Sequence, residues 1–245
     1  MSQHLVPIAE NIWVYPTSTE PNTIQPNVGV IACGDQVVMV DAGSAPPLGR
    51  VIASEIMMLG LRQVDTLIYT HHHWDHIVGA MAYTPRHIIA HEQCATMLDH
   101  LAQRDWLQED VELPPQMVAR LERMATQLDR WHDFRLLQPN MTFSHELTLH
   151  INDTPIELAY VAGRHAQDSI VVKFPQAGVM FLGDCYYPPP QAERPPEGDD
   201  DLAIAMLEAL YAEGYETYID GHGPPRDRDA LATLIDAEKA RQGTA

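Results

Sequence analysis

The chain has 245 residues, of which 45% are hydrophobic, so it is long enough to bury a substantial core. Its 34 acidic residues against 15 basic ones give a formal charge of -19, which repels polyanions over most of the surface. Composition therefore excludes disordered and fibrous classes and makes nucleic acid an unfavourable partner.

Short strands are the first predicted elements. Apolar runs rich in β-branched residues stand between turn signals at Ile12–Tyr15, Val28–Cys33 and Gln36–Asp41, and Gly34-Asp35 separates the last two. This pattern predicts a β-meander. A helix is expected next, at about Pro47–Leu59.

A buried strand expected at Thr66–Thr70 leads directly into a cluster of histidines. From Glu92 to about Asp133 the pattern turns helical, with apolar residues at steps of four, three, four and three. This amphipathic stripe consists of Met117, Leu121, Met124, Leu128 and Trp131. The stripe is explained either by packing on the core or by a lid or dimer face, so a homodimer is one of the alternatives.

The second half of the chain, like the first, is predicted to consist of short strands followed by helices. Strands are expected near Glu146–Ile151, Ile156–Val161, Ser169–Phe174 and Gly178–Leu182, and helices near Leu202–Ala212 and Arg226–Lys239. A proline-rich acidic loop at 188–201 lies between the last strand and these helices. Because no linker separates two units, we expect one α/β domain over residues 1–245, with a helical insertion at about 92–133.

The sequence shows no pattern typical of a signal peptide, a membrane-spanning helix or a disulfide framework. The chain starts without a basic segment followed by an apolar one, and it has no apolar stretch of about 18 residues. Its three cysteines, Cys33, Cys94 and Cys185, are too scattered for a disulfide framework. We therefore expect a cytoplasmic protein with no membrane partner.

Four histidines and one carboxylate stand together just after the buried strand, in the segment from His71 to His76. Residues two apart in an extended segment share a face, so His71 and His73 are expected to converge on one cation while Asp75 and His76 reach a second. Imidazole and carboxylate groups are ligands that zinc accepts and that manganese or iron also use. The segment therefore predicts a metal site.

Three further candidate ligands, His165, Asp184 and His222, each follow an apolar strand. Taken singly, each histidine is equally explained as a surface residue and the aspartate as a helix cap. Small residues beside them allow the tight turns and close approach that converging ligands require. These are Gly163, Gly183, Gly221 and Gly223.

The motif His71-x-His73-x-Asp75-His76, followed by the three later ligands in this order and approximate spacing, resembles the metallo-β-lactamase superfamily over nearly the whole chain. The turn Val40-Asp41-Ala42-Gly43 is similar to that family's first motif. The resemblance implies an α/β fold, a four-layer αβ/βα sandwich of two mixed β-sheets flanked by helices.

The resemblance also implies two divalent metal ions, zinc by first expectation and manganese or iron as alternatives. The first metal takes His71, His73 and His165, and the second takes Asp75, His76 and His222. Asp184 bridges the two ions, and Asp41 orients the ligands from outside.

The implied reaction is hydrolysis by a hydroxide shared between the two metals, with Asp75 orienting it or passing on its proton. Tyr187 is placed like a tyrosine that donates a proton to the developing oxyanion in lactonases of this fold, although packing within its loop explains it equally.

We expect the substrate to be a small-molecule ester, lactone, thioester or amide. Departures from the patterns of glyoxalase II and the B1 β-lactamases, in the Gly163-Arg164-His165 turn and after Asp184, make those two activities less favoured. The alternatives are a phosphodiesterase or nuclease on the same two metals, an iron redox enzyme of this fold, and a non-catalytic, metal-stabilised binding protein.

Overall fold

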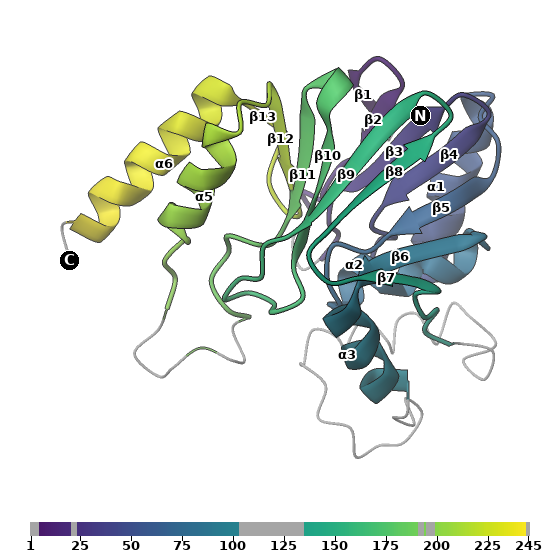
Figure 1. Cartoon of the computed structure of the whole chain (residues 1–245), viewed down its shortest axis with the longest axis horizontal. Coiled ribbons are helices and arrows are strands. Elements are labelled where there is room, and N and C mark those ends of the chain that lie inside the picture. The colour runs from purple at the N-terminus through teal and green to yellow at the C-terminus, as the bar shows by residue number, and fades with distance from the viewer. Residues whose placement is uncertain (1–4, 21–23, 103–134, 191–193, 195–198, 244–245) are drawn as a thin grey trace.

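Two mixed β-sheets form the centre of the computed structural model, which describes residues 5–20, 24–102, 135–190, 194 and 199–243 (Figure 1). The first sheet has seven strands in chain order: β1 (Val6–Ala9), β2 (Ile12–Tyr15), β3 (Val28–Cys33), β4 (Gln36–Val40), β5 (Val64–Ile68), β6 (His87–His91) and β7 (Met141–Phe143). The second has six, in the order β13 (Arg226–Asp227), β12 (Thr217–Asp220), β11 (Val179–Gly183), β10 (Ile170–Phe174), β9 (Thr154–Tyr160) and β8 (Glu146–Ile151).

Helices lie on the outer faces of both sheets (Figure 1). The helical elements are α1 (Pro46–Met58), α2 (Trp74–Ile77), the 3-10 helix η1 (Val78–Ala82), α3 (Glu92–Ala102), the 3-10 helix η3 (Pro175–Ala177), α5 (Ile204–Ala212) and α6 (Arg228–Gly243). Within the described residues, none of these helices is long and apolar enough to cross a membrane.

Three apolar cores hold the layers together. One lies between the first sheet and α1, one between the two sheets, and one between the second sheet and helices α5 and α6. Strand β4 shows how the sequence achieves this, because its side chains alternate between faces. Met39 packs on the helix side, whereas Val38 and Val40 pack between the sheets. The predicted four-layer αβ/βα sandwich is confirmed.

Strands β1, β7 and β13 were not predicted, and several predicted elements differ from the observed ones at their ends. The helix expected from Arg226 begins at Arg228, because Arg226 and Asp227 pair with β12 as the short strand β13. Asp227 then accepts a hydrogen bond from the backbone N–H of Ala230 and caps the helix. The helical region expected at 92–133 is described only as α3, and the stripe from Met117 to Trp131 lies outside the described residues.

Parallel pairing brings the candidate ligands to one edge of the sandwich. Strand β4 runs parallel to β5, and β11 runs parallel to β12, so the carboxyl ends within each pair lie together. The backbone N–H of Ile170 donates to the carbonyl of Thr70 at 2.9 Å, which joins the loop after β5 to the second sheet. The loops after β5, β11 and β12 therefore meet at this edge.

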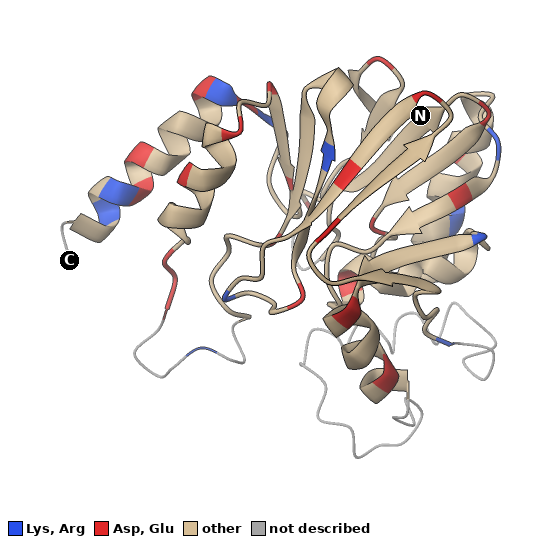
Figure 2. Ribbon diagram, in the orientation of Figure 1, with Lys and Arg blue, Asp and Glu red and all other residues tan. Residues whose placement is uncertain are grey.

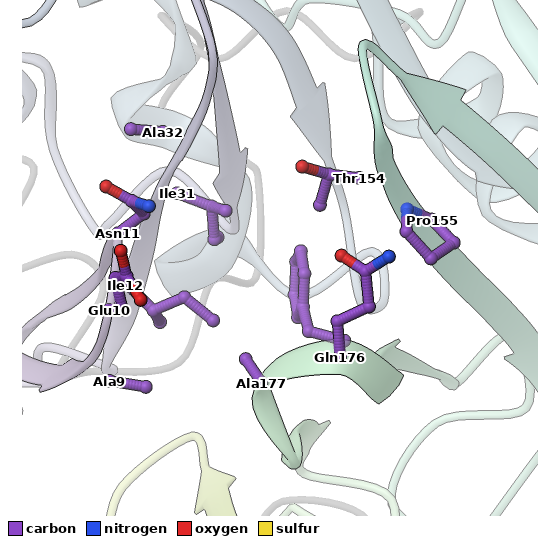
Figure 3. A pocket seen from close by; sticks show the side chains of 11 residues that line it. Ala9, Glu10, Asn11, Ile12, Ile31, Ala32, Thr154, Pro155, Gln176 and Ala177 are labelled. Carbon is purple, nitrogen blue, oxygen red and sulfur yellow. The ribbon is translucent and has the colours of Figure 1, made fainter.

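A cavity of about 410 Å³ opens at the other end of the sandwich (Figure 3). Ile12, Ile31 and Phe174 form its buried apolar floor, while Glu10 and Gln176 stand at its exposed rim. It lies by the β1–β2 turn and by η3, which precedes β11, and so is at the end opposite to the candidate ligands.

Candidate metal centre

Three histidines from two loops converge at the first candidate metal site. The Nδ1 atom of His73 lies 3.0 Å from Nε2 of His71 and 3.0 Å from Nε2 of His165. Tetrahedral zinc with Zn–N bonds near 2.0–2.1 Å places neighbouring ligand nitrogens about 3.3 Å apart. The three nitrogens are thus spaced much as ligands of one ion.

The second group joins the end of the His71–His76 segment to the loop after β12. Nε2 of His222 lies 3.1 Å from Oδ2 of Asp75, and Nε2 of His76 lies 3.6 Å from the same oxygen. Asp75 and His76 are buried, and His222 is partly exposed. These atoms can hold a second ion.

Asp184 stands between the two groups, just after β11. Its Oδ2 atom lies 3.1 Å from Nε2 of His165 in the first group and 3.3 Å from Nε2 of His222 in the second. The same oxygen is 3.5 Å from Nε2 of His76. One carboxylate therefore faces both groups of histidines, as a bridging ligand must.

Two buried atoms of this centre lack a hydrogen-bond partner among the described residues: Nε2 of His76 and Oδ1 of Asp184. An unpaired buried polar atom costs about 1–3 kcal/mol, so native proteins rarely leave one unexplained. Both atoms belong to donor types that bind divalent metals. The residues present therefore fit a pair of divalent ions.

The protonation states match this fit in part. Burial lowers the pKa of His71 well below its usual value, and burial together with His165 lowers that of His73 to about 3, so both rings are neutral and can bind metal. Burial raises the pKa of Asp75, but His76 and His222 outweigh it and bring the value to about 2. For His222, burial lowers the pKa, but Asp184 and Asp75 raise it to about 10. A metal ion bound there would displace that proton.

Asp41 supports the centre from outside, at the end of β4. Its Oδ2 atom lies 2.7 Å from Nδ1 of His76 and accepts a hydrogen bond from the Thr70 hydroxyl at 2.8 Å. The Thr70 hydroxyl is also 3.0 Å from Nδ1 of His71. Partners on the outer ring nitrogens fix the tautomer and aim the inner nitrogens at the ion. Nδ1 of His165 has such a partner in the Pro188 carbonyl, at 2.9 Å.

The comparison with known families agrees with this geometry. The family model described as the metallo-beta-lactamase superfamily matches residues 21–243. The chain belongs to the metallo-beta-lactamase superfamily. The membership expected from the His71–His76 motif is thereby confirmed.

Solved structures of the superfamily share the fold. A metallo-beta-lactamase from Pontibacter korlensis is 19% identical with a TM-score of 0.65, and the match covers 96% of this chain and 98% of that one. One from Hirschia baltica is 17% identical with a TM-score of 0.63, covering 95% of each chain. One from Erythrobacter litoralis is 18% identical with a TM-score of 0.60, covering 96% of each. At these identities the likeness shows the fold alone.

The backbone conformation of the segment from His71 to His76, which supplies ligands to both groups, differs from the expected one. The backbone bends at residues 70–72, His73 has φ -63° and ψ 142°, and α2 begins at Trp74. The extended segment from which the convergence of His71 and His73 was predicted is therefore not what the structure has, although the two rings do lie together. The helical turn brings Asp75 and His76 to His222, because successive helical residues are rotated about 100° around the axis. The ring of His76 also lies 4.2 Å from that of His71, so the two groups adjoin.

Tyr187 was predicted to donate a proton to substrate. Its ring does lie near those of both His165 and His222, with centroid distances of 6.0 and 6.2 Å. Its hydroxyl donates to Oδ1 of Asp220 at 2.8 Å and accepts from the backbone N–H of His222 at 3.3 Å. The described geometry thus commits the phenolic proton to Asp220, and its donation to substrate stays a prediction.

Two buried aspartates beside the centre were missed by the sequence analysis. Asp220 also accepts hydrogen bonds from Tyr186, Arg226 and the backbone of Gly223. Asp168 accepts two hydrogen bonds from His72. The signal was present in each case, since Asp220 stands two residues before His222 and Asp168 three residues after His165.

Gly221 is needed where the loop after β12 passes Asp184. A Cβ atom added at Gly221 would lie 1.9 Å from Oδ1 of Asp184 and 3.0 Å from Cε1 of His76. Gly221→Ala is therefore expected to displace both side chains and to weaken metal affinity at least about 10-fold, measured by chelator competition. Gly243→Ala is the matched control, because its added Cβ would meet nothing within 4 Å. Unchanged affinity in Gly221→Ala would contradict the placement of Asp184 among the ligands.

Proposed function

We propose that this member of the superfamily is a hydrolase that uses two divalent metal ions to cleave a small-molecule ester, lactone, thioester or amide. The observation that carries the proposal is the position of Asp184, whose Oδ2 atom faces histidines of both groups at 3.1 to 3.5 Å. A structural metal site needs one closed set of ligands, whereas a shared carboxylate between two sets suits a binuclear catalytic centre.

Two divalent ions bound there would supply hydroxide at neutral pH and would polarise the bond under attack. The protein's own contribution is to fix the positions of these groups. Asp75 is ionised at neutral pH, since its pKa is about 2, and such a weak base suits orienting the attacking water better than removing its proton. The outer contact of His76 with Asp41, 2.7 Å, holds that ring in place.

A carbonyl substrate fits the surface charge better than a nucleic acid does. Figure 2 shows Lys and Arg positions scattered among more frequent Asp and Glu positions, and within the described residues they form no continuous basic track. Arg164, next to the candidate ligand His165, is already engaged by Asp199 at 2.8 Å. A nuclease or phosphodiesterase of polynucleotides requires such a track to bind the phosphate backbone.

The test is hydrolysis by zinc-loaded protein of a panel comprising a lactone, an aryl ester, a thioester, a β-lactam and a phosphodiester. We expect turnover on a carbonyl substrate and a fall of at least about 100-fold in kcat/KM for Asp75→Ala. Asp35→Ala is the matched control, since Asp35 is an exposed aspartate whose partner is Arg62. Turnover confined to the phosphodiester would overturn the choice of substrate class.

A further inference from the structure

His72 is the histidine of the segment from His71 to His76 that belongs to none of the candidate metal groups among the described residues, and it contacts Asp168. The backbone N–H of His72 donates to Oδ2 of Asp168 at 2.8 Å. The ring atom Nδ1 of His72 lies 2.8 Å from Oδ1 of the same carboxylate. Both oxygens of Asp168 are thus used by one residue, which stands between the ligands His71 and His73.

The position of Asp168 makes this pair a link between two loops. Asp168 follows the ligand His165 by three residues, in the turn before β10, whereas His72 belongs to the loop after β5. The first candidate metal site takes two of its histidines from one of these loops and the third from the other. The two hydrogen bonds therefore set the distance between the two loops that build that site.

The Asp168 carboxylate that makes this link is buried, and burying it costs free energy. Asp168 is 0% exposed, and burying an ionised carboxylate costs several kcal/mol unless strong hydrogen bonds offset it. The Cys94 thiol of α3, also fully buried, is a further hydrogen-bond partner of this carboxylate. Such a group favours one arrangement of its surroundings, because any shift of His72 leaves a buried oxygen unpaired.

We propose that Asp168 is a positioning residue for the first metal site: through His72 it holds His71 and His73 at the spacing from His165 that one ion requires. This inference rests on the proposed function, because it assumes that the first group binds metal. Asp41 contacts His76 of the second group directly and reaches His71 of the first only through Thr70, so its direct contact is with the second group.

The prediction is a selective loss of affinity at one site. Zinc affinity is measured by competition with a chromophoric chelator in two backgrounds, His222→Ala, which removes a ligand of the second site, and His165→Ala, which removes a ligand of the first. In the His222→Ala background Asp168→Ala is expected to weaken zinc binding at least about 10-fold. In the His165→Ala background the change is expected to stay below about 3-fold, well under the range for an outer partner.

Two further variants separate positioning from general destabilisation. His72→Gln keeps an N–H donor for Asp168 and is expected to retain more affinity at the first site than His72→Ala. Glu238→Ala is the matched control, because Glu238 is another buried carboxylate that accepts a backbone N–H, that of Leu202 at 2.9 Å, and it lies on α6. It is expected to lower the melting temperature without changing either zinc affinity.

Equal losses in both backgrounds, or no loss in either, would overturn the role of Asp168. Should Asp168→Ala fail to fold, His72→Ala decides instead, since it removes only the ring contact and leaves the backbone N–H in place. A wild-type chain that binds no zinc would overturn the proposed function as well. A wild-type chain that binds two zinc ions while Asp168→Ala shows no selective loss would overturn this inference alone.

Discussion

Asp184→Ala is expected to lower kcat/KM at least about 1,000-fold, equivalent to roughly 4 kcal/mol of transition-state stabilisation. The physical reason is that Oδ2 of Asp184 lies within 3.5 Å of ring nitrogens from His165, His222 and His76. Its removal therefore takes a ligand from both candidate ions at once. The zinc content of the purified variant is measured together with its activity on the carbonyl substrate identified by the panel.

The control for this substitution is Asp35→Ala, which removes a carboxylate that is 65% exposed and so should alter neither quantity. Far-UV circular dichroism of Asp184→Ala checks that the chain is folded. A folded variant that keeps two zinc ions and wild-type turnover would show that Asp184 does not bridge the ions. It would contradict the proposed binuclear centre.

Removal of the metal is expected to lower the melting temperature by roughly 10 °C. An ion present at about 1,000 times its Kd stabilises a protein by about 4 kcal/mol, and each kcal/mol corresponds to about 2–4 °C in a chain of this size. The structural reason is that bound ions would satisfy buried atoms that lack a hydrogen-bond partner among the described residues, such as Nε2 of His76 and Oδ1 of Asp184. Differential scanning fluorimetry before and after chelation, and after zinc is restored, measures the change.

A variant that lacks ligands in both groups, His165→Ala with His222→Ala, provides the control for chelation. Its melting temperature should not respond to the chelator or to added zinc. If the wild-type melting temperature is also unaffected by both, ions at this centre do not stabilise the native state.

The sequence could bring the candidate ligands together because their signal is local, and metal binding by them stays a prediction. His71, His165, Asp184 and His222 each follow an apolar strand, and carboxyl ends of parallel strands meet at one edge of a sheet. The continuous apolar run of β4, in which every residue after Gln36 is buried, is likewise typical of a sheet with both faces covered. The fold and the candidate site could therefore be predicted from short local sequence patterns.

What the sequence did not predict depends on contacts between distant residues. Asp168 and Asp220 stand near candidate ligands in the sequence, but only the fold shows that they contact His72 and Tyr187. The start of α2 at Trp74 was missed for a different reason, since a helix of four residues is too short to show a period. The supporting groups around the ligands thus required the structure.

The most direct test of a binuclear centre is anomalous diffraction at the zinc edge from crystals of the zinc-loaded protein. Two peaks about 3.5–4 Å apart are expected, one among His71, His73 and His165 and the other among Asp75, His76 and His222. Asp184 should lie between them. A single peak, or peaks away from these residues, would contradict the assignment of two ions to this centre.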